Sequence, residues 1–390
     1  MAAIDRVLNL ADVHRLAKRR LPRAVLEVID GGAGDETTLA ANRADLEAMR
    51  LVPRNLEDVR EVDLSTTVLG QRMAMPFMFA PCSYARMCHP AAERAVAEAA
   101  GRSGVGYIVP GGASEPLDAV AAAATGPLWY QIYLSPDMRR NEDLISVVRA
   151  NRYQALVVSV DTPMMPYRER DMRNGISFPL TVTARLALAG MSRPVWAKNF
   201  VLGNKSAGFS LTAARRAYYS FETAMSGLRP VTLDDLGWLR ARWDGPLVVK
   251  GLLGPDKVRE MVSLGVDAVV VSNHGARNLD GVVSTASAVR SVVDAVAGDL
   301  EVLVDGGVRR GIDVVRMRAL GATASLVGRP YLHGLAAAGP AGVARVARLL
   351  RDEVHVALAF LGLHSFDQIT PEVLAASSAA AGHGLNPWRS

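Results

Sequence analysis

Short apolar runs recur along the chain, and a stretch of helical composition follows each of them. The runs are mostly continuous rather than alternating, and they are rich in Val, Ile or aromatic residues. This pattern is typical of strands buried on both faces, as in a parallel sheet. We predict eight strands, at residues 75–81, 105–110, 128–134, 155–161, 246–251, 268–275, 301–307 and 324–330.

The segments between the strands carry signals for helix starts and stops. Residues 89–104 place Pro90 in a first-turn position and reach Gly101, and residues 254–265 end on Gly265. Eight β–α alternations in a row predict a (β/α)8 TIM barrel. The competing architecture is a doubly wound open sheet. It usually has fewer strands and a Gly-rich turn after the first one, which this chain lacks.

We interpret the whole chain, 1–390, as one domain with additions to a barrel. A long insertion between the fourth and fifth strands is usually a lid or substrate loop, and a plain surface loop is the alternative. The parts are an N-terminal helical cap (1–74), the barrel (75–173 and 231–361), the insertion (174–230) and a C-terminal tail (362–390).

The composition, 50% hydrophobic and 21% charged, is that of an ordinary globular protein. A chain of 390 residues buries about three quarters of its unfolded surface, so it needs no disulfide or metal to fold. Cys82 and Cys88 form no CxxC pair, and we expect two reduced thiols and no metal site. No apolar run approaches the roughly 18 residues of a membrane helix, and residues 1–20 resemble an amphipathic helix rather than a signal peptide. We therefore expect a cytoplasmic protein with no integral membrane segment.

The chain is basic, with a net charge of +5. Its Lys and Arg residues are spread along the sequence rather than gathered in one tail, which argues against a nucleic-acid partner. A small anionic ligand held by a few arginines fits this distribution better.

Polar residues end seven of the eight predicted strands. The carboxyl ends of barrel strands meet at one rim, where the active sites of such barrels lie. The sequence therefore predicts a site there. The strand-end residues are Pro81, Cys82 and Ser83; Gln131 and Tyr133; Ser159 and Asp161; Lys250; Ser272, Asn273 and His274; Asp305, Gly306 and Gly307; and Gly328 and Arg329.

The last two strand ends favour phosphate binding. Barrels commonly bind phosphate with the loops after strands seven and eight, where VDGGVRRG (304–311) and LVGRP (326–330) stand. Glycines let backbone N–H groups approach an anion, and Arg309 and Arg329 can neutralise it. The alternative is that the glycines serve only as turns.

His274 is the candidate general base, since it follows a buried strand directly and an imidazole titrates near neutral pH. Asp161, at another strand end, could orient it. Arg277 and Arg168 are candidates to hold a substrate carboxylate through bidentate hydrogen bonds.

The segment SNHGARNLD (272–280) resembles the active-site motif of the FMN-dependent 2-hydroxy acid oxidases and dehydrogenases. That family includes glycolate oxidase, lactate oxidase and dehydrogenase, and mandelate oxidase and dehydrogenase. The resemblance extends over almost the whole chain. It includes residues 21–36, 64–81, WYQIY (129–133), SVDTP (159–163), LVVKG (247–251), VDGGVRRGIDV (304–314) and LVGRPYLHGLAAAG (326–339).

The resemblance implies an FMN cofactor and oxidation of an L-2-hydroxy acid to the 2-oxo acid. His274, paired with Asp161, would take a proton, Arg277 and Arg168 would bind the carboxylate, and Tyr133 would hydrogen-bond the substrate. By analogy the chain forms a homo-oligomer, a tetramer or larger, and oxygen or another acceptor reoxidises the flavin. The implied flavin contacts are Pro81, Cys82, Ser83, Gln131, Ser159, Lys250 and Ser272 for the ring and ribityl chain, and Asp305, Gly306, Gly307, Arg309, Gly328 and Arg329 for ribityl and phosphate.

Three positions depart from the family pattern. Val28 stands where a carboxylate-binding Tyr is usual, Pro110 replaces a Ser or Thr near the flavin, and Gly112 replaces a pocket aromatic. Two large side chains are lost, so we expect a wider pocket and a substrate bulkier than glycolate or lactate, such as the aryl-substituted mandelate.

Other functions stay open. The insertion and the segment GLHSFDQITPEVL (362–374) are similar to the mycofactocin-pathway branch of the family, which oxidises a peptide-derived intermediate, but that branch tends to lack the arginine kept here as Arg277. Lys250 could instead be the Schiff-base lysine of a barrel aldolase or lyase. A catalytically inactive flavin-binding protein is the third possibility.

Overall fold

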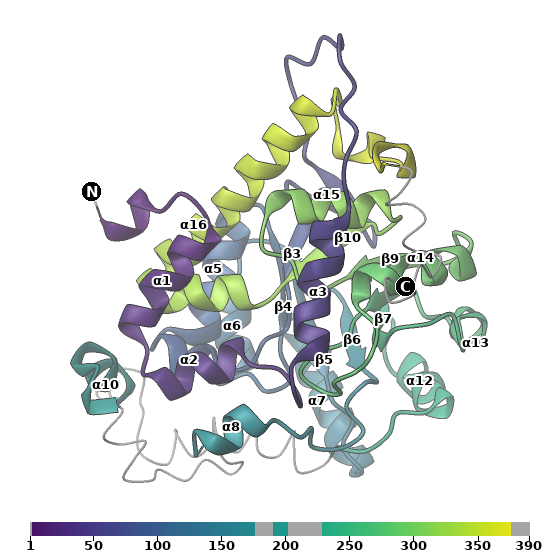
Figure 1. The fold of residues 1–390 in the computed structure, drawn as a ribbon. Helices are drawn as coiled ribbons and strands as arrows, with labels where there is room; N and C mark the ends of the chain where they lie inside the picture. Colours follow the sequence, from purple (N-terminus) through teal and green to yellow (C-terminus); the bar gives the residue numbers. More distant parts are fainter. Residues whose placement is uncertain (1, 176–189, 202–227, 376–390) are drawn as a thin grey trace.

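The computed structural model describes residues 2–175, 190–201 and 228–375. Eight parallel strands close into a barrel in the order β10-β3-β4-β5-β6-β7-β8-β9 (Figure 1). Closure excludes the open sheet and confirms the predicted barrel. The strands are β3 (Phe77–Phe79), β4 (Gly106–Val109), β5 (Leu128–Ile132), β6 (Leu156–Ser159), β7 (Leu247–Leu252), β8 (Ala268–Val271), β9 (Glu301–Val304) and β10 (Ala324–Val327).

All eight strands fall within or overlap the predicted runs, and most are shorter than predicted. The runs are apolar throughout because each strand is buried on both faces. Met78, Ile108 and Trp129 fill the barrel interior, while Phe77 and Phe79 on the alternate positions of β3 pack in the larger outer core. Gln131, Ser159 and Lys250 lie in the last residues of their strands, and the other polar residues at the ends of the runs lie in the loops of the rim.

Helices surround the barrel (Figure 1). Each strand leads into a helix before the chain returns to the next strand, which is the right-handed β–α repeat of this fold. The surrounding helices are α5 (Ala92–Arg102), α6 (Leu117–Ala123), α7 (Met138–Ala150), α12 (Leu233–Arg240), α13 (Val258–Ser263), α14 (Thr285–Val296), α15 (Gly311–Ala319) and α16 (Arg329–Phe360).

The N-terminal segment forms a helical cap against α16. Leu10, Val13 and Ala17 face inward from α1 (Leu10–Arg20), and the side chain of Asn9 caps the first turn of this helix. α2 (Arg23–Asp30) and α3 (Thr37–Ala48) then lead to the strands β1 (Thr66–Val68) and β2 (Gln71–Met73). The remaining elements are η1 (Ala3–Arg6), α4 (Ala85–Cys88), α8 (Glu169–Arg173), α10 (Pro194–Val201), η2 (Phe366–Gln368) and η3 (Pro371–Val373).

The hairpin of β1 and β2 closes the amino end of the barrel. Val68 and Met73 pack into the interior cluster, and the Gln71 Oε1 atom accepts a hydrogen bond of 3.0 Å from the indole N–H of Trp129. This end of the barrel is therefore filled by side chains, which leaves the carboxyl rim for a ligand.

Most of the predicted insertion, and with it the predicted lid, lies outside the described residues. Within it, α10 is held against the body of the protein, since the Trp196 indole N–H donates to the Met87 carbonyl at 2.7 Å. The predicted tail is described as far as residue 375. Across the described ranges, none of the helices combines the length and the apolar character needed to cross a membrane.

Candidate active site

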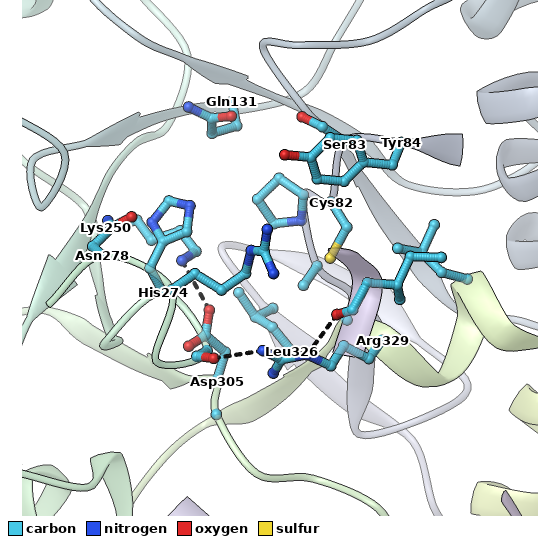
Figure 2. A pocket seen from close by; sticks show the side chains of 18 of the residues that line it. Cys82, Ser83, Tyr84, Gln131, Lys250, His274, Asn278, Asp305, Leu326 and Arg329 are labelled. Carbon is cyan, nitrogen blue, oxygen red and sulfur yellow. Dashed lines mark hydrogen bonds and ion pairs between the residues drawn. The ribbon is translucent and has the colours of Figure 1, made fainter. Parts of the chain in front are cut away.

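A pocket opens at the carboxyl ends of the strands. Its volume, including the part that is open to solvent at its mouth, is about 1000 Å3. Figure 2 shows Gln131, Lys250 and His274 around one side of it, with Ser83 and Arg329 on others. All predicted site residues line this pocket except Ser159, Asp161 and Ser272, which lie behind the lining. The lining set is Pro81, Cys82, Ser83, Gln131, Tyr133, Arg168, Lys250, His274, Arg277, Asp305, Gly306, Gly307, Arg309, Gly328 and Arg329.

A tight turn after β8 presents His274 to the pocket. His274, Gly275 and Ala276 all have positive φ angles, a backbone conformation that side-chain-bearing residues rarely adopt. The backbone N–H of His274 donates to the Ser272 Oγ atom at 3.0 Å, which holds the turn. Strain of this kind is found where the surrounding structure fixes a functional side chain.

The imidazole of His274 is oriented from behind. Its Nδ1 atom lies 3.1 Å from each carboxylate oxygen of Asp161, and its Nε2 atom lies 3.3 Å from the hydroxyl of Tyr133. Burial alone would raise the pKa of Asp161, but the facing imidazole lowers it below its ordinary value. An ionised Asp161 favours the tautomer with the proton on Nδ1, so the Nε2 lone pair points into the pocket.

Lys250 lies in an ionic network on the floor of the pocket. Its Nζ atom is 2.8 Å from a carboxylate oxygen of Asp305 (Figure 2). It also donates to the Ser272 hydroxyl at 2.8 Å. Burial lowers the pKa of Lys250, but the carboxylates of Asp305 and Asp161 outweigh burial and raise it above its ordinary value. A Schiff-base lysine must lose its proton to attack a carbonyl, so this environment argues against the aldolase hypothesis.

A bulge in β7 leaves room for the side chain of Asp161. The register against β8 shifts between Lys250 and Leu252, and Gly251 has a φ of 117°. A Cβ atom on Gly251 would lie 2.5 Å from the side chain of Asp161. Glycine is therefore required for the carboxylate to lie behind the imidazole.

Two guanidinium groups form a cationic wall of the pocket. The NH1 group of Arg277 donates to the carbonyls of Val28 and Gly31, while its NH2 group is buried without a hydrogen-bond partner. The Nε of Arg168 donates to the carbonyl of Arg277 at 2.9 Å. Burial and the charge of Arg277 lower the pKa of Arg168. The carboxylate of Asp171 lies 3.9 Å from Arg168 and 3.6 Å from Arg277, and it offsets this lowering only in part. Such a wall favours a carboxylate ligand.

A second cationic region lies after β9 and β10. Gly306 and Gly307 both have positive φ angles, and α16 begins directly after Gly328. Burial and the charge of Arg43 lower the pKa of Arg309 to about 10. Burial and the charges of Arg309 and Arg277 lower the pKa of Arg329 to about 9.

Several buried polar atoms of the site lack a partner. These are Gln131 Nε2, Asp305 Oδ1 and Ser159 Oγ, in addition to the Arg277 NH2 group. A buried polar group without a hydrogen bond costs about 1–3 kcal/mol, so this set indicates a polar ligand. FMN fits it: an amide and a hydroxyl suit its ring, and a carboxylate suits its ribityl hydroxyls. A helix N-terminus beside the buried Arg329 and the half-buried Arg309 suits its phosphate.

Tyr84 and Asn278 also line the pocket, although the strand-end argument did not select them (Figure 2). Tyr84 has a φ of 76° and precedes α4, and the Arg277 guanidinium lies 5.8 Å from its ring centroid. Asn278 Nδ2 donates to the Asp161 carbonyl at 2.8 Å. Asn278 lies four positions after His274 in the signature segment, so its place in this segment could have indicated a site residue. No comparable sequence signal pointed to Tyr84.

The three departures from the family pattern are not equivalent in the structure. Val28 lines the pocket, whereas Pro110 and Gly112 are outside its lining. Of the three, Val28 is therefore the position whose side chain forms part of the pocket wall, whereas Gly112 has no side chain to do so.

A family model for FMN-dependent dehydrogenases matches residues 17–376 of the chain. Among curated proteins, an L-lactate dehydrogenase of Caulobacter vibrioides (strain NA1000 / CB15N) is 39% identical over 382 residues, covering 96% of this chain and 100% of its own length. An L-lactate dehydrogenase of Pectobacterium atrosepticum is 38% identical over 371 residues, covering 93% and 95%.

Solved structures with the same fold include two proteins named for mandelate. A mandelate oxidase in complex with (S)-2-phenylpropionate has a TM-score of 0.79 and 36% identity, covering 95% of this chain and 98% of its own. An (S)-mandelate dehydrogenase, described as a monotopic membrane protein, has a TM-score of 0.87 and 31% identity, covering 95% and 99%.

Proposed function

Since the chain belongs to the FMN-dependent dehydrogenase family, whose members oxidise 2-hydroxy acids, we propose that it oxidises an L-2-hydroxy acid bulkier than lactate, with His274 as base. One observation carries this proposal. The Nε2 atom of His274, oriented by Asp161, faces a pocket that Arg277 also lines, and the NH2 group of Arg277 makes no hydrogen bond. A proton acceptor and a carboxylate-binding cation thus share one cavity, as a 2-hydroxy acid requires.

Each group in the pocket has one task in this reaction. Arg277 and Arg168 hold the substrate carboxylate, and Tyr133, beside the imidazole, hydrogen-bonds the hydroxyl oxygen. His274 Nε2 takes a proton from the substrate, and Asp161 stabilises the imidazolium that results. The Arg277 NH2 group makes no hydrogen bond to the protein, so a substrate carboxylate could accept from it without displacing one.

FMN, when bound, accepts the two electrons that leave the hydroxy acid. Gln131, Ser159 and Lys250 would hold its ring, and the protonated Lys250 would favour negative charge there. Arg309 and Arg329 would hold the phosphate. The lowered pKa values of these two arginines give the strongest electrostatic reason for an anion in this region.

Val28 supports a substrate larger than lactate. It is fully buried in the pocket lining, and its side chain is much smaller than the Tyr usual at this position in the family. Lactate is the substrate named for the curated relatives, and mandelate for the structural neighbours. The choice between them therefore depends on pocket size, which a series of substrates tests directly.

The substrate test uses L-lactate, L-2-hydroxybutyrate and L-mandelate with the FMN-loaded enzyme under anaerobic conditions. We expect kcat/KM for reduction of the bound FMN to rise with side-chain size and to be highest for mandelate. A maximum at lactate would contradict the proposed pocket size and leave the reaction type intact. The D-enantiomers serve as controls for stereochemistry.

The base is tested with His274→Gln. We expect reduction of the bound FMN by the substrate to slow by about 10² to 10⁴-fold, the usual contribution of a general base. The FMN content should stay unchanged. His355→Gln, on the exposed side of α16, is the matched control and should react like the wild type. A rate within a few-fold of wild type for His274→Gln would remove His274 from the mechanism.

The phosphate contact is tested with Arg309→Ala and its neighbour Arg310→Ala. Arg309 lines the pocket, whereas Arg310 is exposed and pairs with Glu353. Loss of a charged hydrogen bond costs about 1.5–3 kcal/mol, so FMN affinity should fall about 10- to 150-fold in Arg309→Ala alone. Equal FMN loss in both variants, measured by fluorescence after dialysis, would refute this assignment.

We also propose a cytoplasmic location, a homo-oligomer of four or more chains, and oxygen or another acceptor for the reduced flavin. Cell fractionation, light scattering of the purified enzyme and anaerobic reduction followed by oxygen test these three proposals separately.

A further inference from the structure

Two histidines and an aspartate converge outside the flavin pocket, where the cap meets α16. His14 comes from α1, Asp30 ends α2, and His333 lies in the first turns of α16. The Nε2 atoms of His14 and His333 each lie 2.7 Å from a different carboxylate oxygen of Asp30. The three ligand-type atoms lie within 4.8 Å of one another, and no other such group occurs in the parts of the chain that the structure describes.

We propose that His14, Asp30 and His333 bind a divalent transition-metal ion of the zinc type. Imidazole nitrogen and carboxylate oxygen are ligands that zinc takes in proteins. With bonds of about 2.0–2.1 Å, the ligand atoms of a tetrahedral site lie roughly 3.4 Å apart. To reach that spacing, the two imidazole–carboxylate distances of 2.7 Å would lengthen, and the distance between the two Nε2 atoms, at most 4.8 Å, would shorten.

The burial of the three side chains suits an ion that enters from solvent. His333 is almost fully buried and fixed, whereas the side chains of His14 and Asp30 are 37% and 25% exposed. Water can complete the coordination on the open side. The ion would replace the hydrogens that the two imidazoles now direct at one carboxylate, and Asp30 supplies the anionic ligand.

The proposed metal site connects to the wall of the pocket through the backbone. Asp30 stands between Ile29, whose carbonyl accepts from Arg329 Nε at 2.9 Å, and Gly31, whose carbonyl accepts from Arg329 NH2 and Arg277 NH1 at 2.8 Å. An ion on Asp30 and His333 would therefore fix the segment that orients both guanidinium groups. It would also bind the cap to α16.

This site could not be predicted from the sequence, from which we expected no metal site. His14 and Asp30 are 16 residues apart and His333 follows 303 residues later, so no ligand spacing exists to read. Only the packing of α1 on α16 brings the three side chains together.

The first experiment titrates ZnCl2 into the FMN-loaded, full-length protein after treatment with a chelator and its removal by dialysis. Calorimetry should show one equivalent bound. The His14→Ala variant should bind more weakly by at least about tenfold, since even a lost outer-shell partner costs 10- to 100-fold. His355→Ala, which removes an exposed histidine of α16, is the matched control and should bind as the wild type does.

The second experiment needs no variant. One equivalent of Cu²⁺ added to the wild-type holoenzyme should give an electron paramagnetic resonance spectrum with hyperfine coupling to two imidazole nitrogens. No stoichiometric zinc binding, equal binding in His14→Ala, or a copper spectrum without two nitrogen ligands would each overturn the metal site. None of these results bears on FMN reduction, so the proposed function stands or falls separately.

Discussion

At the scale of single residues, Tyr84 places a phenol hydroxyl in the pocket. At position 28, where the family usually has a tyrosine, this chain has Val28. The Tyr84 side chain lines the cavity and interacts electrostatically with Arg168 and Tyr133, and its ring lies beside the Arg277 guanidinium. These are the groups that we propose for the substrate carboxylate and hydroxyl. Tyr84 therefore stands where it can replace the hydroxyl that the family usually supplies from position 28.

We predict that Tyr84→Phe raises KM for the hydroxy acid about tenfold and changes kcat little, because a hydrogen bond to a charged group contributes about 1.5–3 kcal/mol and is made equally in ground and transition states. Steady-state kinetics with the preferred substrate gives both constants. Tyr167→Phe, at an exposed tyrosine before α8, is the control. An unchanged KM would exclude Tyr84 from carboxylate binding.

The residue identities at the strand ends could be predicted, and so could the pairing of His274 with Asp161, but the other contacts of these residues could not. His274, Lys250 and Asp305 were selected because a polar residue that ends a buried strand must reach the rim. Tyr84 follows no such rule, since it lies beyond the strand end in a left-handed turn. The carbonyls that orient Arg277 and Arg329 were unpredictable for another reason: every residue has a carbonyl, so its use leaves no trace in the sequence.

At the scale of elements, strand positions were predictable because eight short apolar runs admit few alternatives to a closed parallel sheet. Helix ends were less so. α16 runs from Arg329 to Phe360 with non-helical backbone at Ala338 and Gly339, just before Pro340. Pro340 was visible in the sequence, yet whether a proline ends a helix or only bends it depends on what packs around it.

The bend of α16 brings Gly334 and Gly342 into contact. A Cβ atom on Gly342 would lie 1.8 Å from the Gly334 carbonyl oxygen, so Gly342→Ala must push the two halves of the helix apart. Alanine favours a helix by about 1 kcal/mol over glycine, but overpacking costs typically 1–3 kcal/mol and more at such an overlap. We therefore predict a net loss of about 2 kcal/mol in the free energy of unfolding.

Urea denaturation measures this loss. Gly237→Ala in α12 is the matched control, because the nearest atom to its added Cβ would be 3.7 Å away. That substitution should be neutral or stabilising by up to about 1 kcal/mol. If both variants were equally stable, the contact within α16 would be irrelevant to folding.

The start of α12 gives a pH-dependent prediction. Asp235 completes a capping box with Thr232, and both its oxygens lie 2.7 Å from the Arg229 guanidinium. The hydrogen bonds from Arg229 hold the pKa of Asp235 below its ordinary value of 3.8. The stabilisation is therefore fully present above pH 3.8 and is lost as the pH falls through the lowered pKa.

We expect Asp235→Asn to lower the free energy of unfolding by about 1 kcal/mol at pH 7, and the difference from wild type to shrink toward pH 3. Denaturation from pH 7 down to pH 3 tests this. Asp234→Asn, at the exposed neighbour, should show a smaller difference throughout. A constant difference for Asp235→Asn across this range would show that charge is not the cause.

At the scale of the whole molecule, the site is assembled from both ends of the chain. The carbonyls of Val28 and Gly31 hold Arg277, and those of Ile29 and Gly31 hold Arg329. The N-terminal cap, predicted from its helical pattern alone, is thus part of the pocket wall. A sequence pattern reports which elements form, whereas long-range contacts such as these depend on how the elements pack.

Closure of the barrel has a consequence for synthesis on the ribosome. The first strand, β3, pairs with the last, β10, which is translated about 250 residues later. At a translation rate of about 5–20 residues per second, β10 is synthesised roughly 10 to 50 s after β3. Nascent chains stalled before residue 324 should therefore retain no FMN in pull-down experiments, while released full-length chains should. The cofactor is then acquired only after translation is nearly complete, and until that moment chaperones must shield an open sheet edge.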